Sequence, residues 1–177
     1  MSLFKPQSKT KITAVSFHRI SDDVSPAYPP ITVKVFERLI NYLNKNYQII
    51  SLDDIEKEYE GTKQRLILTF DDAFYDFKEN ALQILKKHSL PSVLNSIPSC
   101  LDTGETFWTQ KLNKTDLNKK NIEKVGIDIY QKLLPLDEKI RDNIIDNLAK
   151  KHNIDIFQPM LTWDDLEYCK ENNVTIG

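Results

Sequence analysis

The amino-acid sequence predicts an α/β domain built around a parallel β-sheet. Strand-like and helix-like segments alternate through the first hundred residues, which is typical of βα units. Residues 65–70 (RLILTF) form a nearly continuous apolar run, as in a parallel strand that is covered on both faces. With 177 residues, of which 40% are hydrophobic and 28% charged, the chain is long enough to bury the core of one globular domain.

Seven elements are expected in the first hundred residues. Thr32 is the expected N-cap of the first helix, whose apolar face carries Val35, Phe36, Leu39, Ile40 and Leu43. Ser51 and Asp54 have the spacing of a capping box and open a short helix to about residue 59. The remaining elements are strands at 11–17, 47–50, 65–70 and 92–97, and a helix at 74–88.

The pattern changes after the fourth strand, and we interpret residues from about 105 to 160 as a helical insert in a domain that covers 11–177. Residues 1–10 are expected to be a tail. Within the insert, the Lys- and Asn-rich stretch 111–124 indicates a solvated loop or weak helix. A clearer helix is expected at 137–152, with Ile140, Ile144, Ile145 and Leu148 as its apolar stripe. Thr162 then caps a helix to about residue 172, and a strand begins at Val174.

The composition excludes several classes of protein. A net charge of −2 argues against a nucleic-acid-binding surface, and no run approaches the roughly 18 apolar residues of a membrane helix. The two cysteines, Cys100 and Cys169, are expected to be reduced and buried, with a single disulfide as the alternative. The first nine residues contain no apolar signal segment. The default expectation is a cytoplasmic protein, and the alternative is that a native leader has been removed.

Adjacent aspartates occur four times, but only Asp71 and Asp72 end a buried apolar strand. The carboxyl ends of strands are where α/β folds place their sites. Two carboxylates in one pocket repel each other, so one would be the general base and a bound cation would keep the other ionised. The alternative interpretation is that Asp72 merely caps the helix that begins near Phe74.

Other residues that could carry chemistry are few. His18 ends the first strand and is expected at the same edge as the aspartate pair, whereas His88 and His152 follow Lys-Lys pairs at helix ends. Trp108 could stack on a sugar ring or could anchor the core of the insert. There is no HExxH zinc motif, no G-x-S-x-G elbow and no Gly-rich phosphate loop.

At Leu68-Thr69-Phe70-Asp71-Asp72 the sequence resembles the polysaccharide deacetylases, the carbohydrate esterases with a NodB-homology domain. Their first motif is T-F-D-D after a buried strand. Three further stretches resemble the opening strand, the first helix with the second strand, and the helix and strand before the second motif of that family. These are residues 14–20, 31–54 and 161–177.

The resemblance implies the N-terminal part of a distorted TIM-like (β/α) barrel, here incomplete, that removes N-acetyl groups from a glycan. By this resemblance Asp71 would be the general base, Asp72 would be a ligand of a divalent metal ion, with zinc as the expected metal, and His18 would line the substrate pocket. Trp108 is the other expected substrate contact, because an exposed aromatic ring can stack on a sugar. The usual Gly after D-D is Ala73 here. The family's two histidine ligands lie in an H-[ST]-x-x-H motif just beyond the strand that begins at Val174.

The 177-residue chain lacks those histidines, so we expect it to be inactive by itself. The alternative from another class is a non-catalytic, truncated barrel that binds a glycan or a partner. A homodimer could cover the open barrel edge. A Mg²⁺-dependent phosphotransfer domain is a third alternative, but the sequence offers no D-x-D pattern for it.

Overall fold

The computed structural model describes residues 11–23, 29–115, 129–153, 155–157 and 159–177, so the expected tail at 1–10 lies outside the described residues. The chain divides into two compact units. The sheet unit takes residues up to Ser21, Ile31–Ile97 and Leu161–Gly177, and the helical unit takes Asp22–Pro30 and Pro98–Met160. The longer segment of the helical unit begins at Pro98 and ends at Met160.

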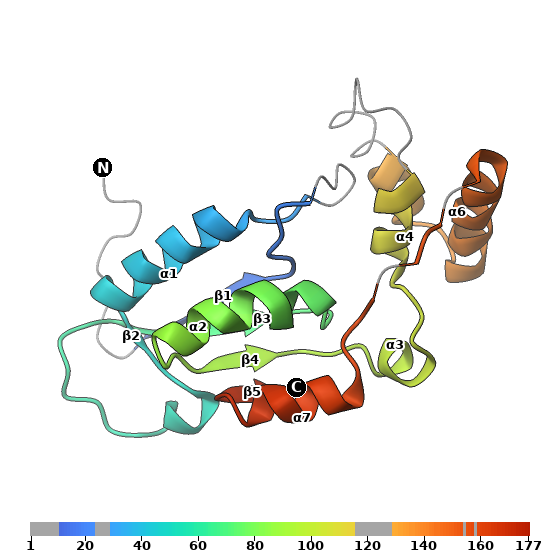
Figure 1. The fold of residues 1–177 in the computed structure, drawn as a ribbon. Coiled ribbons are helices and arrows are strands. Elements are labelled where there is room, and N and C mark those ends of the chain that lie inside the picture. The colour runs from blue at the N-terminus through green and yellow to red at the C-terminus, as the bar shows by residue number, and fades with distance from the viewer. Residues whose placement is uncertain (1–10, 24–28, 116–128, 154, 158) are drawn as a thin grey trace. The chain divides into compact units, whose positions relative to one another are not determined.

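The sheet unit is built from parallel strands, as the sequence predicts. Strand β3 (Arg65–Phe70) lies at its centre, and β1 (Ile12–Phe17) pairs with it along its whole length. On the other edge of β3, β2 (Gln48–Ile49) pairs with its start and β4 (Ser92–Leu94) with its end. Strand β5 (Val174–Ile176) pairs with β4, and the order β1-β3-β4-β5 can be followed in Figure 1. An α/β fold with a parallel sheet is confirmed.

The burial of β3 follows from its sequence. Leu66, Ile67, Leu68 and Phe70 are all buried, so both faces of the strand are covered. Phe70 lies within a group of aromatic rings, with ring centroids 5.2 Å from Phe17, 5.9 Å from Phe36 and 4.8 Å from Phe77. This core lies directly beneath the strand end that carries the aspartate pair.

Helices accompany the strands in the expected order. Helix α1 (Val33–Asn46) buries Phe36, Ile40 and Leu43, and Thr32 is its N-cap residue, as expected, although the Thr32 side chain makes no cap bond. Val35, which is expected on the apolar face, is exposed. The capping box of Ser51 exists, yet it opens only the 3₁₀ turn η1 (Leu52–Asp54). After β3 come the π-helical segment η2 (Phe77–Ala81) and α2 (Leu82–Lys87).

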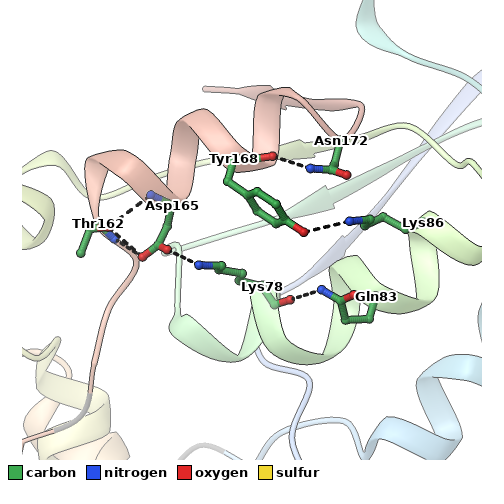
Figure 2. A network of polar contacts seen from close by, with 7 residues as sticks. All are labelled: Lys78, Gln83, Lys86, Thr162, Asp165, Tyr168 and Asn172. Carbon is green, nitrogen blue, oxygen red and sulfur yellow. Dashed lines mark hydrogen bonds and ion pairs between the residues drawn. The ribbon is translucent and has the colours of Figure 1, made fainter.

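Helix α7 (Trp163–Lys170) is fastened to η2 and α2 by the polar network of Figure 2. The Asp165 carboxylate accepts hydrogen bonds from Thr162 at its own N-cap, which confirms the predicted cap, and from Lys78 Nζ at 2.5 Å. Burial raises the pKa of Asp165, but the bonds from Lys78 and Thr162 outweigh it and hold the pKa below 3.8. Lys86 donates to the Tyr168 hydroxyl at 2.8 Å. These bonds join α7, the helix before β5, to the helical segments that follow β3.

The helical unit contains α3 (Pro98–Thr103), α4 (Trp108–Thr115) and α6 (Glu138–His152). Asp137 caps α6 through its carboxylate, a cap that the sequence analysis did not predict. Ile145 is buried, but Ile140 and Ile144 are exposed, so the predicted apolar stripe is wrong there. The predicted loop or weak helix at 111–124 starts inside α4, and residues 116–128 lie outside the described residues. No helix in the described part of the chain has the length and apolarity needed to cross a membrane.

Candidate active site

The carboxyl ends of β1, β3 and β4 bring three polar side chains together around Asp71. The Asp71 amide donates to the Phe17 carbonyl oxygen at 2.8 Å, so the β1–β3 ladder runs one residue past the strand. On the other side, the Asn95 amide donates to the Phe70 carbonyl oxygen at 2.8 Å. Asp71 therefore sits on a backbone that is fixed from both sides, at the edge where the sequence predicts a site.

Both oxygens of the Asp71 carboxylate accept a hydrogen bond. Ser16 Oγ donates to Oδ2 at 2.5 Å, and Asn95 Nδ2 donates to Oδ1 at 2.8 Å. His18 Nε2 lies 3.9 Å from Oδ2, so the structure places His18 beside the aspartate pair. The arrangement leaves lone pairs of a fixed carboxylate for a further donor, as a general base requires.

Asp72 differs from Asp71 in the hydrogen bonds that its carboxylate accepts. Among the described residues its carboxylate accepts no hydrogen bond, and in particular none from the amides of the helical segment that follows. Burial raises its pKa above 3.8; the nearby His18 opposes this shift and the charge of Asp71 adds to it. A half-buried carboxylate with no donor is suited to a cation, so the helix-cap interpretation of Asp72 has no support in these contacts.

The turn that carries Asp72 is strained. Asp72 has φ of 73° and Ala73 has φ of 52°, in the left-handed region that costs a non-Gly residue about 1–2 kcal/mol. Ala73 stands where the family that the sequence resembles has Gly. Unlike Gly, alanine adopts a positive φ only at an energetic cost. The Ala73 carbonyl oxygen accepts from the Leu161 amide at 3.0 Å, and the π-helical η2 follows within a few residues. Such irregular backbone is common at functional sites.

A buried ion pair fixes the segments on which His18 and Asp72 stand. Arg19 Nε donates to Asp76 Oδ2 at 2.8 Å, and the two side chains are 4% and 10% exposed. The other oxygen of Asp76 accepts from the Ile20 amide at 3.3 Å, and Asn80 Nδ2 donates to the Ile20 carbonyl oxygen at 2.8 Å. The chain after β1 is thereby tied to the helical segment after β3.

The described residues do not supply a complete set of ligands for a metal ion. No three His, Cys, Asp or Glu side chains in that part of the chain are grouped closely enough to share an ion. Asp72 fits one ligand position, because it is half-buried and accepts no hydrogen bond there. These residues therefore do not fit a complete zinc site, for which three protein ligands are the usual minimum.

The structure places Trp108 in the core of the helical unit. Trp108 is 8% exposed, and its ring stacks on that of Tyr130 with 5.4 Å between the ring centroids. The Arg141 guanidinium lies 4.4 Å from the centroid of the Trp108 ring. Leu112, Leu133 and Ile145 complete the cluster. This packing matches the core-anchor interpretation rather than an exposed sugar platform. Cys100 and Cys169 are both buried and not joined in a disulfide, as expected, and burial raises the pKa of the Cys169 thiol to about 11.

Sequence reasoning did not single out Ser16, Asn95, Arg19 or Asp76. The one available signal was a polar residue inside or directly after an apolar strand, as at Ser16 and Asn95. That signal is weak, because nothing in the sequence shows which strands are neighbours or in which register they pair.

Replacing Asp72 with Asn is expected to stabilise the metal-free protein at pH 7. Because the pKa is raised in the folded state, the folded protein binds more protons above pH 3.8, and stability falls as pH rises through the folded-state pKa. We expect thermal unfolding to show a rise in Tm of no more than about 4 °C at pH 7. Asn also tolerates a left-handed φ, so the diagnostic result is that part of the gain disappears as pH falls from the folded-state pKa through 3.8. A gain that is the same at every pH would contradict a charge effect.

No family model matches the sequence, and no curated protein sequence matches it either. Solved structures do match. A de-N-acetylase from Aggregatibacter actinomycetemcomitans aligns with a TM-score of 0.55 and 18% sequence identity, over 94% of this chain and 53% of that protein. The chain therefore spans about half the length of that de-N-acetylase.

Two further solved structures are more distant. A deacetylase from Streptococcus pyogenes in complex with acetate has a TM-score of 0.48 and 18% identity, over 80% of this chain and 81% of that one. IcaB from Ammonifex degensii has a TM-score of 0.46 and 14% identity, over 92% of this chain and 81% of that one. Only the de-N-acetylase exceeds a TM-score of 0.5 among these three. The likeness to it shows that this chain shares the α/β fold of the aligned part of that protein.

Proposed function

We propose that the protein is a hydrolase that removes N-acetyl groups from a polysaccharide or other glycan, cleaving a carbon–nitrogen bond that is not a peptide bond. One observation carries the proposal: the Asp71 carboxylate is held between two strand ends, beside a half-buried Asp72 that accepts no hydrogen bond from the described residues. The fold shared with a de-N-acetylase supports it. We also propose that the sheet is part of a distorted barrel of βα units.

In the proposed reaction Asp71 acts as the general base. Its fixed carboxylate accepts a proton from the water that attacks the acetamide carbonyl carbon. Asp71 then returns that proton to the nitrogen of the tetrahedral intermediate as the carbon–nitrogen bond breaks, which releases acetic acid, ionised to acetate in solution, and leaves a free amine on the sugar. His18, whose Nε2 lies 3.9 Å from Asp71 Oδ2, would lie beside the reacting groups and contact the substrate.

We propose that a divalent metal ion, with zinc as the expected metal, binds at Asp72. The remaining ligands would come from outside the described residues. When bound, such an ion stabilises negative charge that develops on the acetamide oxygen. The proposal rests on the chemistry of Asp72, a carboxylate in a half-buried position with no hydrogen-bond donor among the described residues. A bound cation would offset the cost of keeping this carboxylate ionised.

The test is acetate release from N-acetylated chitooligosaccharides by the full-length gene product, meaning the protein encoded by the whole reading frame that contains these 177 residues. We expect release with added zinc, loss after chelation and recovery when zinc is restored. The 177-residue chain assayed in parallel is expected to release none, because Asp72 alone holds a metal weakly. Robust turnover by that chain which Asp71→Asn abolishes would contradict the expected inactivity.

The second candidate is a module that binds a glycan or a partner without catalysis. The incomplete ligand group in the described residues favours it. Glycan binding by the full-length product without acetate release under any metal would support this candidate and contradict the deacetylase. A dimer in sizing chromatography would agree with two copies covering an open sheet edge.

A further inference from the structure

We propose that Ser16 and Asn95 are positioning residues that hold the Asp71 carboxylate from both sides. The inference rests on the proposed function, in which Asp71 is the general base. Ser16 Oγ lies 2.5 Å from Asp71 Oδ2 and Asn95 Nδ2 lies 2.8 Å from Oδ1. The two donors come from β1 and from the residue directly after β4, the strands that flank β3.

The backbone beneath these three side chains is fixed by the sheet. Ser16 pairs in register with Thr69, two residues before Asp71, and the Asn95 amide donates to the Phe70 carbonyl oxygen at 2.8 Å. Ser and Asn have short side chains, so little conformational freedom is lost when they hold a partner. The sheet therefore presents both donors to Asp71 without any rearrangement.

Two donors on opposite oxygens restrict the Asp71 carboxylate in a way that one cannot. Rotation about the bond that joins the carboxylate to its Cβ would break both hydrogen bonds at once. Each oxygen keeps a lone pair, so the held carboxylate can still accept a proton from a water. Asp72, the neighbouring residue, accepts no such bonds among the described residues. The chain thus holds one carboxylate in place and leaves the next available to a cation.

The expected consequence is a loss of rate without a loss of stability. Ser16 and Asn95 are both exposed, so removing either hydrogen bond changes the free energy of unfolding little. A misplaced catalytic group, in contrast, lowers the rate of the chemical step steeply. A merely structural role would produce the opposite pattern, a lower Tm with kcat kept.

The kinetic test uses matched variants of the full-length gene product in the acetate-release assay. Ser16→Ala and Asn95→Ala are each expected to lower kcat about tenfold with KM unchanged, the size typical of a residue that orients a catalytic group. Ser16→Thr keeps the hydroxyl and is expected to restore the rate. Asn46→Ala is the control, because Asn46 is also exposed and also donates through Nδ2, at 2.7 Å to the Tyr42 carbonyl oxygen at the end of α1.

A second measurement does not depend on activity. In the 177-residue chain, NMR of side-chain amides is expected to show that Asp71→Ala shifts the Asn95 Nδ2 signals and speeds their exchange with solvent, while the Asn46 signals stay unchanged. Unchanged Asn95 signals would overturn the proposed contact. Wild-type kcat in Ser16→Ala and Asn95→Ala, with activity lost in Asp71→Asn, would overturn the positioning role and leave the proposed function standing. Activity that survives Asp71→Asn would contradict the proposed function, and the NMR result would still decide the contact.

Discussion

Replacing Asp71 with Asn is expected to lower kcat for acetate release about 10²–10⁴-fold, the range that a general base contributes. Asn has nearly the same shape as Asp, so Ser16 can still donate to the amide oxygen, and the turn is expected to keep its conformation. What is lost is the negatively charged proton acceptor. The measurement is kcat of the full-length gene product on an N-acetylated glycan, with thermal unfolding to confirm that the variant is folded.

Asp164→Asn is the matched control for Asp71→Asn. Asp164 also belongs to an adjacent aspartate pair and lies exposed in the first turn of α7. We expect this variant to retain the wild-type rate, because Ser16, Asn95 and His18 lie beside Asp71, and no contact among the described residues joins them to Asp164. A rate for Asp71→Asn as high as that for Asp164→Asn would rule out Asp71 as the base.

Replacing Arg19 with Met is expected to cost about 3–5 kcal/mol of unfolding free energy, the usual loss when one partner of a buried ion pair is removed. The Arg19 and Asp76 side chains are almost fully buried and 2.8 Å apart, so the substitution would leave the Asp76 carboxylate buried without its cationic partner. The expected loss would be measured by urea unfolding at pH 7. Because the pair joins the segments after β1 and β3, we also expect the positions of His18 and Asp72 to become less well defined.

A double variant separates the pair from the packing around it. Arg19→Met with Asp76→Leu removes both charges and is expected to recover part of the stability that Arg19→Met loses. Lys87→Met is the surface control, because Lys87 pairs with Glu37 at 3.3 Å with both side chains exposed, and its loss should cost less than about 1 kcal/mol. If Arg19→Met lowers the unfolding free energy no more than Lys87→Met does, then burial does not increase the contribution of the Arg19–Asp76 pair to stability.

The parts of the fold that depend on local pattern could be predicted from the sequence. The apolar run of β3 and the regular spacing of Phe36, Ile40 and Leu43 each determine burial through one element's own geometry. The same is true of the Thr162 cap, which acts over three residues. The position of Asp71 and Asp72 at a strand end also follows from the pattern, because the apolar run stops there.

The parts that depend on pairing between distant segments could not be predicted. Ser16 and Asn95 meet Asp71 only because β1 and β4 flank β3 in a particular register, which no local pattern specifies. Arg19 and Asp76 are 57 residues apart in the sequence. The exposed Ile140 shows the same limit, since helical spacing gives a helix one apolar face but not the surface against which it packs.

The most direct test of the division of roles between the two carboxylates is zinc binding by the full-length gene product, measured by isothermal titration calorimetry for the wild type, Asp71→Asn and Asp72→Asn. We predict that Asp72→Asn weakens zinc binding more than about tenfold, because a ligand is lost, whereas Asp71→Asn leaves the affinity close to that of the wild type. Equal weakening in both variants, or zinc binding that neither substitution changes, would contradict the assignment of Asp72 as the ligand and Asp71 as the base.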